Sequence, residues 1–240
     1  MNLAPAPAIR AAAASVLDVF ASRQGEGVCV GDPQVFVRFG GCNLVCDYCD
    51  TPESIPTGSG IRQDIRSVLQ RIDELDKGRS GAAVSLTGGE PLVQIRFLEA
   101  LIPALKQSGR RVYLETNGTL PRALEKIIDG CDWIAMDIKA ESATGHDLWE
   151  AHRWFLEIGQ NKAFVKMILT DRTVEAEFLR AVDLIAGVRP DIPLILQPAT
   201  PWGTAGSLPL AALVSWWTQA VARLRDVRIL PQIHRLWDIP

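Results

Sequence analysis

Short apolar segments alternate with longer amphipathic ones along most of the chain. The short segments are rich in Val, Ile, Leu and Phe and are bounded by Gly, Pro or Asp. This pattern is typical of strands that are buried on both faces of a parallel sheet. It predicts seven strands, over residues 35–39, 82–86, 112–115, 133–137, 163–169, 193–197 and 227–230.

Between these segments, apolar residues recur at intervals of three or four positions, the spacing of one face of an α-helix. The spacing predicts helices over residues 65–75, 95–105, 174–185 and 210–224. Strands that alternate with helices form a parallel sheet covered by helices. We therefore expect an α/β fold.

Length and composition indicate one globular domain. The 240 residues contain no internal repeat, and the Ala- and Pro-rich start, residues 1–18, is expected to be a flexible extension of a single domain over 19–240. A net charge of −3 argues against general nucleic-acid binding. No apolar run approaches the roughly 20 residues of a membrane span, and no secretory signal pattern is present. We expect a cytoplasmic protein without nucleic-acid or membrane partners.

Three of the five cysteines form a C-x3-C-x2-C run: Cys42, Cys46 and Cys49. In a protein that is not exported, such spacing is typical of a metal or cluster site. Three thiolates suit a [4Fe–4S] cluster with one open iron. A structural zinc ion needs a fourth ligand, and the histidines are remote in sequence. The spacing favours iron–sulfur but leaves zinc open.

Glycine and polar residues follow four of the predicted strands, over residues 40–50, 87–91, 115–118 and 137–139. Parallel strands present their carboxyl ends at the same edge of a sheet, where ligands bind. We expect these four segments to form one site. The two remaining cysteines, Cys29 and Cys131, are predicted to be small buried side chains.

Two of these segments together resemble the radical S-adenosylmethionine superfamily. They are the cysteine run, with Tyr48 before its last cysteine, and Thr87-Gly88-Gly89-Glu90-Pro91 after the next predicted strand. The resemblance implies a [4Fe–4S] cluster whose open iron binds S-adenosylmethionine. Gly88, Gly89 and Glu90 would hold the amino group of that cofactor. Reduction would then release a 5′-deoxyadenosyl radical that abstracts a hydrogen atom.

The same resemblance implies a partial (β/α) barrel of six to seven mainly parallel strands. A complete eight-stranded barrel takes about 250 residues, which would need nearly the whole chain. The partial barrel also leaves one side open to substrate.

The flanking segments resemble the 7-carboxy-7-deazaguanine synthase family. They are residues 22–27, 37–41, 49–51, 115–119 and 234–240, and the resemblance covers residues 19–240. It implies the radical ring contraction of 6-carboxy-5,6,7,8-tetrahydropterin to 7-carboxy-7-deazaguanine, with loss of ammonia, in queuosine and deazapurine biosynthesis. Another radical S-adenosylmethionine enzyme, such as a glycyl-radical activase, is the alternative. Residues 24–27 and Asp50-Thr51 argue against an activase.

The resemblance also assigns residues. Thr51 would contact Mg²⁺, and further S-adenosylmethionine contacts would come from Asn117, Lys139 and Gln197. Arg38 is a candidate site residue even without the resemblance, because a charge inside an apolar strand is rarely buried without a partner. Its planar guanidinium group suits a carboxylate as that partner. The implied substrate contacts are Gln24, Gly25, Glu26, Arg38, Thr87, His234 and the terminal Pro240.

Protein partners follow from the resemblance alone. It implies a reducing electron donor such as flavodoxin or ferredoxin, and a homodimer.

Overall fold

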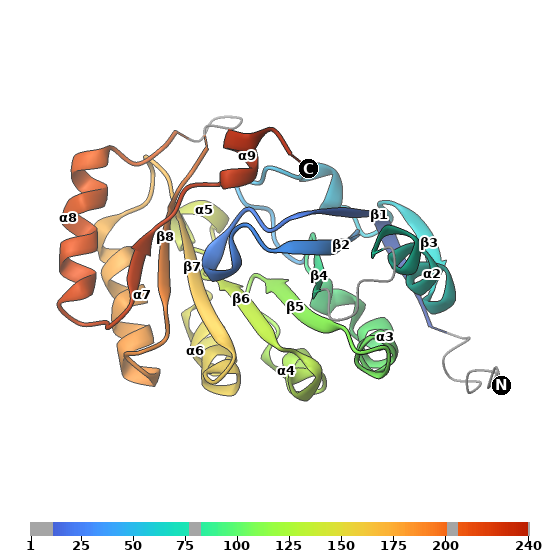
Figure 1. Cartoon of the computed structure of the whole chain (residues 1–240). Helices are drawn as coiled ribbons and strands as arrows, with labels where there is room; N and C mark the ends of the chain where they lie inside the picture. Colours follow the sequence, from blue (N-terminus) through green and yellow to red (C-terminus); the bar gives the residue numbers. More distant parts are fainter. Residues whose placement is uncertain (1–11, 77–82, 201–205, 240) are drawn as a thin grey trace.

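The computed structural model describes residues 12–76, 83–200 and 206–239. Nine strands within these residues form one curved sheet in the order β3-β1-β2-β4-β5-β6-β7-β8-β9, with β3 and β9 as its two edges (Figure 1). The strands are β1 (Ala13–Arg23), β2 (Pro33–Phe39), β3 (Ile61–Asp64), β4 (Ala83–Gly88), β5 (Arg111–Thr116), β6 (Trp133–Asp137), β7 (Ala163–Leu169), β8 (Leu194–Pro198) and β9 (Val227–Ile229).

The parallel part of the sheet runs from β2 through β4 to β9. All seven predicted strands are therefore present, and the expected partial barrel is confirmed. The sheet contains two more strands than predicted, since β1 pairs antiparallel with both β2 and β3.

Strand β1 corrects the prediction of a flexible extension over residues 1–18 for its last part, residues 13–18. It begins at Ala13, and the side chains of Ala14, Val16 and Val19 are buried. Its pairing with β2 shifts register between Val16 and Asp18. This irregularity places buried residues three positions apart, so the strand lacks the alternation that would have revealed it. Residues 1–11 lie outside the described part of the chain.

Helices cover one side of the sheet. The four predicted helices are confirmed as α2 (Ile65–Asp76), α3 (Ile95–Gln107), α7 (Glu175–Val188) and α8 (Leu210–Val221), and α6 (Trp149–Gly159) was not predicted. Figure 1 shows α3, α4, α6 and α7 along this side. The short elements are α4 (Pro121–Leu124), α5 (Glu141–Thr144), α9 (Ile233–Trp237), η1 (Gly27–Cys29), η2 (Pro52–Ser54), η3 (Pro91–Gln94) and η4 (Ile128–Gly130).

The two faces of the parallel strands carry different side chains. Residues such as Val112 and Leu114 belong to the large apolar core, which also includes the inner faces of the helices. The opposite face carries a smaller apolar cluster of Cys29, Tyr113, Ala135, Phe164 and Ile195. Two residues further along the same strands, this face becomes polar, at Glu115, Asp137, Lys166 and Gln197.

This change in polarity positions the functional site. Side chains two residues apart in a strand point to the same face. The interior of the partial barrel is therefore closed by apolar side chains at one end and lined by polar ones at the carboxyl ends of the strands. Among the described residues, no helix combines the length and apolar character needed to cross a membrane.

Replacement of Val16 by Ala tests whether β1 is part of the core. The substitution removes about two methylene equivalents from a fully buried site, so we expect the free energy of unfolding to fall by about 2 kcal/mol. Val93→Ala, at a side chain that is 42% exposed, is the matched control and should cost about 0.5 kcal/mol or less. If urea denaturation showed that both variants lower the free energy of unfolding equally, the placement of β1 in the core would be contradicted.

Candidate active site

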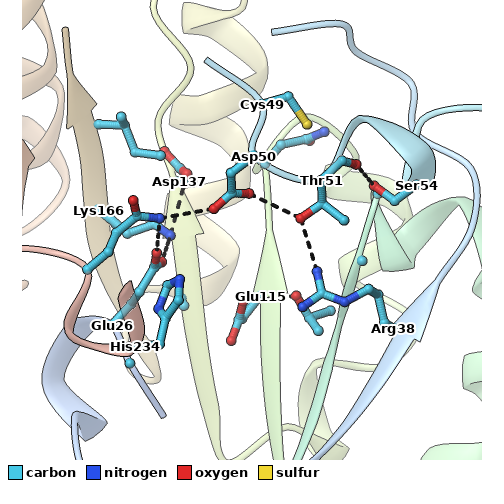
Figure 2. A pocket seen from close by; sticks show the side chains of 18 of the residues that line it. Glu26, Arg38, Cys49, Asp50, Thr51, Ser54, Glu115, Asp137, Lys166 and His234 are labelled. Atoms are coloured by element: carbon cyan, nitrogen blue, oxygen red, sulfur yellow. Dashed lines mark hydrogen bonds and ion pairs between the residues drawn. The ribbon is translucent and has the colours of Figure 1, made fainter. Parts of the chain in front are cut away.

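A cavity of about 690 Å³ opens at the carboxyl ends of the parallel strands. The four polar segments predicted to converge all contribute to its lining, which confirms that expectation. Figure 2 shows their side chains pointing toward one another from different strands and loops. The lining residues from these segments are Cys42, Leu44, Cys46, Tyr48, Cys49, Asp50, Thr87, Gly88, Gly89, Glu115, Thr116, Asn117, Asp137 and Lys139.

The cysteine loop forms one wall of this cavity, and all three of its cysteines line it. Burial raises the pKa of each thiol, and that of Cys46 reaches about 11. Thiolates are the form that binds metal, so ligation would release their protons. Three sulfur donors on one wall suit an iron–sulfur cluster with an open iron. Within the described residues, no three His, Cys, Asp or Glu side chains surround a single point as one metal ion would require.

Two glycines at the end of β4, Gly88 within the strand and Gly89 after it, bring the backbone against the base of the cysteine loop. Gly88 has a φ of +128°, and a Cβ there would lie 2.2 Å from the carbonyl oxygen of Phe39. A Cβ on Gly89 would lie 2.4 Å from the carbonyl oxygen of Gly41. Only glycine fits such a close approach, and both residues line the cavity. Their backbone is thus available to a ligand bound next to the cysteines.

Glu90, which was predicted to help hold the amino group of S-adenosylmethionine, follows the two glycines. Its side chain is fully buried and does not line the cavity. It accepts hydrogen bonds from the backbone N–H of Leu92 (3.0 Å), the hydroxyl of Thr116 (2.9 Å) and the backbone N–H of Asn117 (2.7 Å). Burial raises the pKa of Glu90 to about 7 despite these donors. The carboxyl group therefore joins the ends of β4 and β5.

Asn117 and Lys139 line the cavity as expected. Asn117 Nδ2 donates to Asn43 Oδ1 in the cysteine loop (2.9 Å). Lys139 Nζ lies 2.8 Å from Asp137 Oδ2 and 5.0 Å from the ring centroid of Tyr48. Burial lowers the pKa of Lys139, but the neighbouring Asp137 raises it by more. The pKa therefore lies well above its usual value. The ammonium group therefore stays charged beside the cysteines.

Gln197, which was predicted to contact S-adenosylmethionine, is not among the residues that line the cavity. The side chain is fully buried and donates to Glu26 Oε1 (3.0 Å). A residue at a strand end can either contact a ligand or hold another side chain in place. Its position in the sequence does not show which of these roles it has.

Glu26 gathers polar side chains from three other segments at the cavity. It forms an ion pair with Lys166 of β7 and accepts from Gln232 Nε2 (2.9 Å) as well as from Gln197. Burial raises the pKa of Glu26, but the ion pair and these donors outweigh it and lower the pKa to about 2. Glu26 is therefore a carboxylate at every physiological pH.

Gln24 and Thr87 meet at a second carboxylate, Glu115. Gln24 Nε2 donates to Glu115 Oε1 (2.9 Å), and Thr87 Oγ1 donates to Oε2 (2.9 Å). Ser85 Oγ also donates to Oε1 (3.1 Å). The predicted Gln24 and Thr87 thus lie together, with Glu115 holding both at the floor of the cavity.

Arg38 begins a chain of hydrogen bonds across the cavity (Figure 2). Its Nη1 donates to Thr51 Oγ1 (3.2 Å), and Thr51 Oγ1 donates to Asp50 Oδ1 (3.1 Å). The guanidinium carbon also lies 5.5 Å from the ring centroid of Phe20. The expectation that Arg38 has partners is confirmed, and the side chain lies next to the predicted metal ligand Thr51.

His234 lines the cavity from the short helix α9, as the tail motif predicted. It packs directly on Gly25, where a Cβ would lie 2.4 Å from His234 Nδ1. The backbone N–H of Ile233 donates to the carbonyl of Gly25 (2.9 Å). Pro240, the other tail residue that was predicted to contact substrate, lies outside the described residues, whereas Asp238 and Ile239 line the cavity.

Sequence reasoning missed Lys166 and Gln232. Lys166 is a charged residue inside the apolar strand β7. The same signal identified Arg38, so the sequence contained the information needed to find Lys166. Gln232 bridges Glu26 and Asp50, with 3.1 Å to Asp50 Oδ2, but no local pattern marks it. Cys29 and Cys131 are buried, as predicted.

Comparisons with known proteins agree with these motifs. The family model described as the radical SAM superfamily matches residues 36–185. The 7-carboxy-7-deazaguanine synthase of Geobacter sulfurreducens is 43% identical over 92% of this chain and 96% of its own length. That of Methanopyrus kandleri is 37% identical over 93% of each chain. The crystal structure of QueE from Escherichia coli superposes with a TM-score of 0.65 over 92% of this chain and 95% of that one, at 20% identity, which shows a shared fold.

Gly25→Ala tests whether Gly25 seats α9 over the cavity. The added Cβ would collide with the His234 ring, so we expect α9 to move away and the Ile233 amide to exchange its hydrogen about tenfold faster. Gly58→Ala is the matched control, because nothing lies within 4 Å of its Cβ position. Unchanged exchange at Ile233 would show that the close contact does not hold the helix.

Glu26→Gln tests the ion pair with Lys166. The substitution leaves a buried ammonium without its main partner, so we expect a loss of about 3 kcal/mol in the free energy of unfolding at neutral pH. Because the folded pKa of about 2 lies below the ordinary 4.5, this stabilisation is complete above pH 4.5 and is lost as the pH falls toward 2. The difference in the free energy of unfolding between the natural protein and Glu26→Gln should therefore shrink on acidification. A gap that does not change with pH contradicts the pairing.

Proposed function

This chain belongs to the radical SAM superfamily and, within it, to the 7-carboxy-7-deazaguanine synthase family, and we propose that it catalyses that family's reaction. The substrate is 6-carboxy-5,6,7,8-tetrahydropterin, and the products are 7-carboxy-7-deazaguanine and ammonia, in queuosine and deazapurine biosynthesis. The observation that carries the proposal is that one cavity is lined by the three cysteines together with Glu26, Arg38 and His234.

The cysteine wall supports the cofactor part of the proposal. Cys42, Cys46 and Cys49 would hold a [4Fe–4S] cluster, which with S-adenosylmethionine supplies a carbon radical able to abstract a hydrogen atom. The backbone at Gly88 and Gly89 would accept hydrogen bonds from the amino group of S-adenosylmethionine, since both glycines line the cavity whereas the Glu90 carboxyl is buried behind them. Lys139 and Asn117 would contact its more distant parts.

Polar residues elsewhere in the cavity lining support the choice of a pterin. Glu26 is ionised and can accept hydrogen bonds from N–H groups on the edge of a planar heterocycle. Gln24 and Thr87 supply further polar contacts from the cavity floor, and Gly25 lets the His234 ring lie close beside them. Arg38 would pair with the substrate carboxylate through its planar fork.

Mg²⁺ completes the proposal at Thr51. The Thr51 hydroxyl lies between Arg38 and Asp50, so one oxygen donor is already held beside the position proposed for the substrate carboxylate. Mg²⁺ prefers oxygen ligands, keeps several waters and often shares oxygens with the substrate. Thr51, water and the substrate carboxylate would together form such a shell.

Two protein partners belong to the proposal. Flavodoxin or ferredoxin would supply the electron. A homodimer is supported by α8, which has no charged residue and exposes apolar side chains at the spacing of a helix–helix seam. A second copy of the chain fits this face, because an uncharged apolar stripe is complementary to itself across a two-fold axis. The exposed side chains are Leu210, Val214, Trp217 and Val221.

The test is an anaerobic assay of the protein reconstituted with iron and sulfide, with dithionite, Mg²⁺, S-adenosylmethionine and 6-carboxy-5,6,7,8-tetrahydropterin. Mass spectrometry should detect 7-carboxy-7-deazaguanine and 5′-deoxyadenosine. Release of 5′-deoxyadenosine without the deazaguanine would contradict the substrate. A colourless protein that carries zinc would contradict the cofactor.

Thr51→Ala and Thr51→Ser test the metal site in the same assay. Loss of the hydroxyl should raise the Mg²⁺ concentration for half-maximal activity about tenfold, whereas Ser keeps the oxygen and should respond like the natural protein. The iron content of both variants is the control and should be unchanged. An alanine variant with the natural Mg²⁺ response would remove Thr51 from the site.

A further inference from the structure

His152 is a buried histidine to which the proposed function gives no role. It lies on α6 with none of its surface exposed, on the side of the sheet away from the cavity lining. Its Nε2 lies 3.1 Å from the backbone carbonyl oxygen of Asn117. Its Nδ1 is buried and has no hydrogen-bond partner. A polar ring with one partner and one bare nitrogen is costly to bury, so its single contact needs an explanation.

The contact fixes the form of the ring. A carbonyl oxygen only accepts, so Nε2 carries the hydrogen and donates it to Asn117. Burial lowers the pKa of His152 to about 4, so the ring is neutral and Nδ1 is unprotonated. His152 therefore acts as a fixed donor of one hydrogen bond.

Asn117 is held from its other side by Glu90. The carboxyl of Glu90 accepts the backbone N–H of Asn117 at 2.7 Å, while His152 donates to the backbone C=O of the same residue. The Asn117 side chain is also fixed, since Oδ1 accepts from Thr119 and Nδ2 donates to Asn43 in the cysteine loop at 2.9 Å. A continuous set of contacts thus runs from α6 to the loop that carries the cysteines.

Packing at Gly118 adds a second constraint. Gly118 has a φ of +67°, and a Cβ there would lie 2.7 Å from Met136 Cε and 3.3 Å from His152 Cδ2. The turn after β5 therefore runs so close to the imidazole ring and to Met136 that there is no room for a side chain between them. A shift of the ring toward the turn would therefore require the turn to move.

We propose that His152 is a positioning residue for the S-adenosylmethionine site: by donating to the Asn117 carbonyl, it holds the turn after β5 and, through Asn43, the cysteine loop in one arrangement. The inference rests on the proposed function only in naming S-adenosylmethionine as the ligand. It assigns to α6 a role in cofactor binding across the sheet.

The test compares His152→Gln with His152→Met. The two side chains have the same length, and only glutamine has an N–H group at the position of Nε2. Loss of one hydrogen bond to a buried carbonyl should weaken S-adenosylmethionine binding by about fivefold to tenfold in the methionine variant, with the glutamine variant within about twofold of the natural protein. Binding is measured by anaerobic calorimetry on the cluster-loaded protein without pterin. His146→Met, at an exposed histidine, is the control.

A second readout uses the chain without cluster or cofactor. The backbone amides of Asn117, Gly118 and Thr119 should exchange hydrogen several-fold faster in His152→Met than in His152→Gln. Equal behaviour of the two variants in binding and exchange would overturn the proposal, because packing and not the donated hydrogen bond would then be responsible. If the deazaguanine assay fails but the two variants still differ, the proposed function falls and the role of His152 stands.

Discussion

The buried ion pair between Glu26 and Lys166 is the interaction on which the organisation of the cavity depends. It joins the loop after β1 to β7, across the interior of the partial barrel. Gln197 from β8 and Gln232 from the segment before α9 bind the same carboxylate. Two buried charges are stable only when the remaining hydrogen-bonding positions are also filled. That requirement gathers four segments, distant in sequence, around one anion.

Glu90 is also a buried carboxyl group, but it is surrounded by neutral hydrogen-bond donors instead of a cation. No cation contacts it directly, and three neutral donors surround it, so burial dominates and its pKa rises to about 7, while that of Glu26 falls to about 2. Glu26 presents a permanent charge to the cavity, whereas Glu90 joins β4, β5 and the backbone of Asn117. Of these two glutamates at the same edge of one sheet, one therefore faces the cavity and the other holds the segments around it together.

The alternation of side chains along the strands explains why this edge is chemically rich. Tyr113 and Glu115 share one face of β5, as Phe164 and Lys166 share one face of β7. The apolar member of each pair closes the interior of the barrel, and the polar member lines the cavity above it. This apolar layer beneath the cavity excludes water from one side of the site, which strengthens the electrostatic interactions of the groups that line it.

The sequence by itself determined the parallel sheet, its seven regular strands and the cysteine and glycine motifs at their ends, because these depend on periodicity and spacing within a few residues. It did not reveal β1, whose register shift after Val16 breaks the alternation. Nor did it give the directions of Glu90 and Gln197 or the importance of Lys166 and Gln232. Only the tertiary structure decided these, because the direction of a polar side chain at a strand end is set by donors and charges from segments far away in the chain.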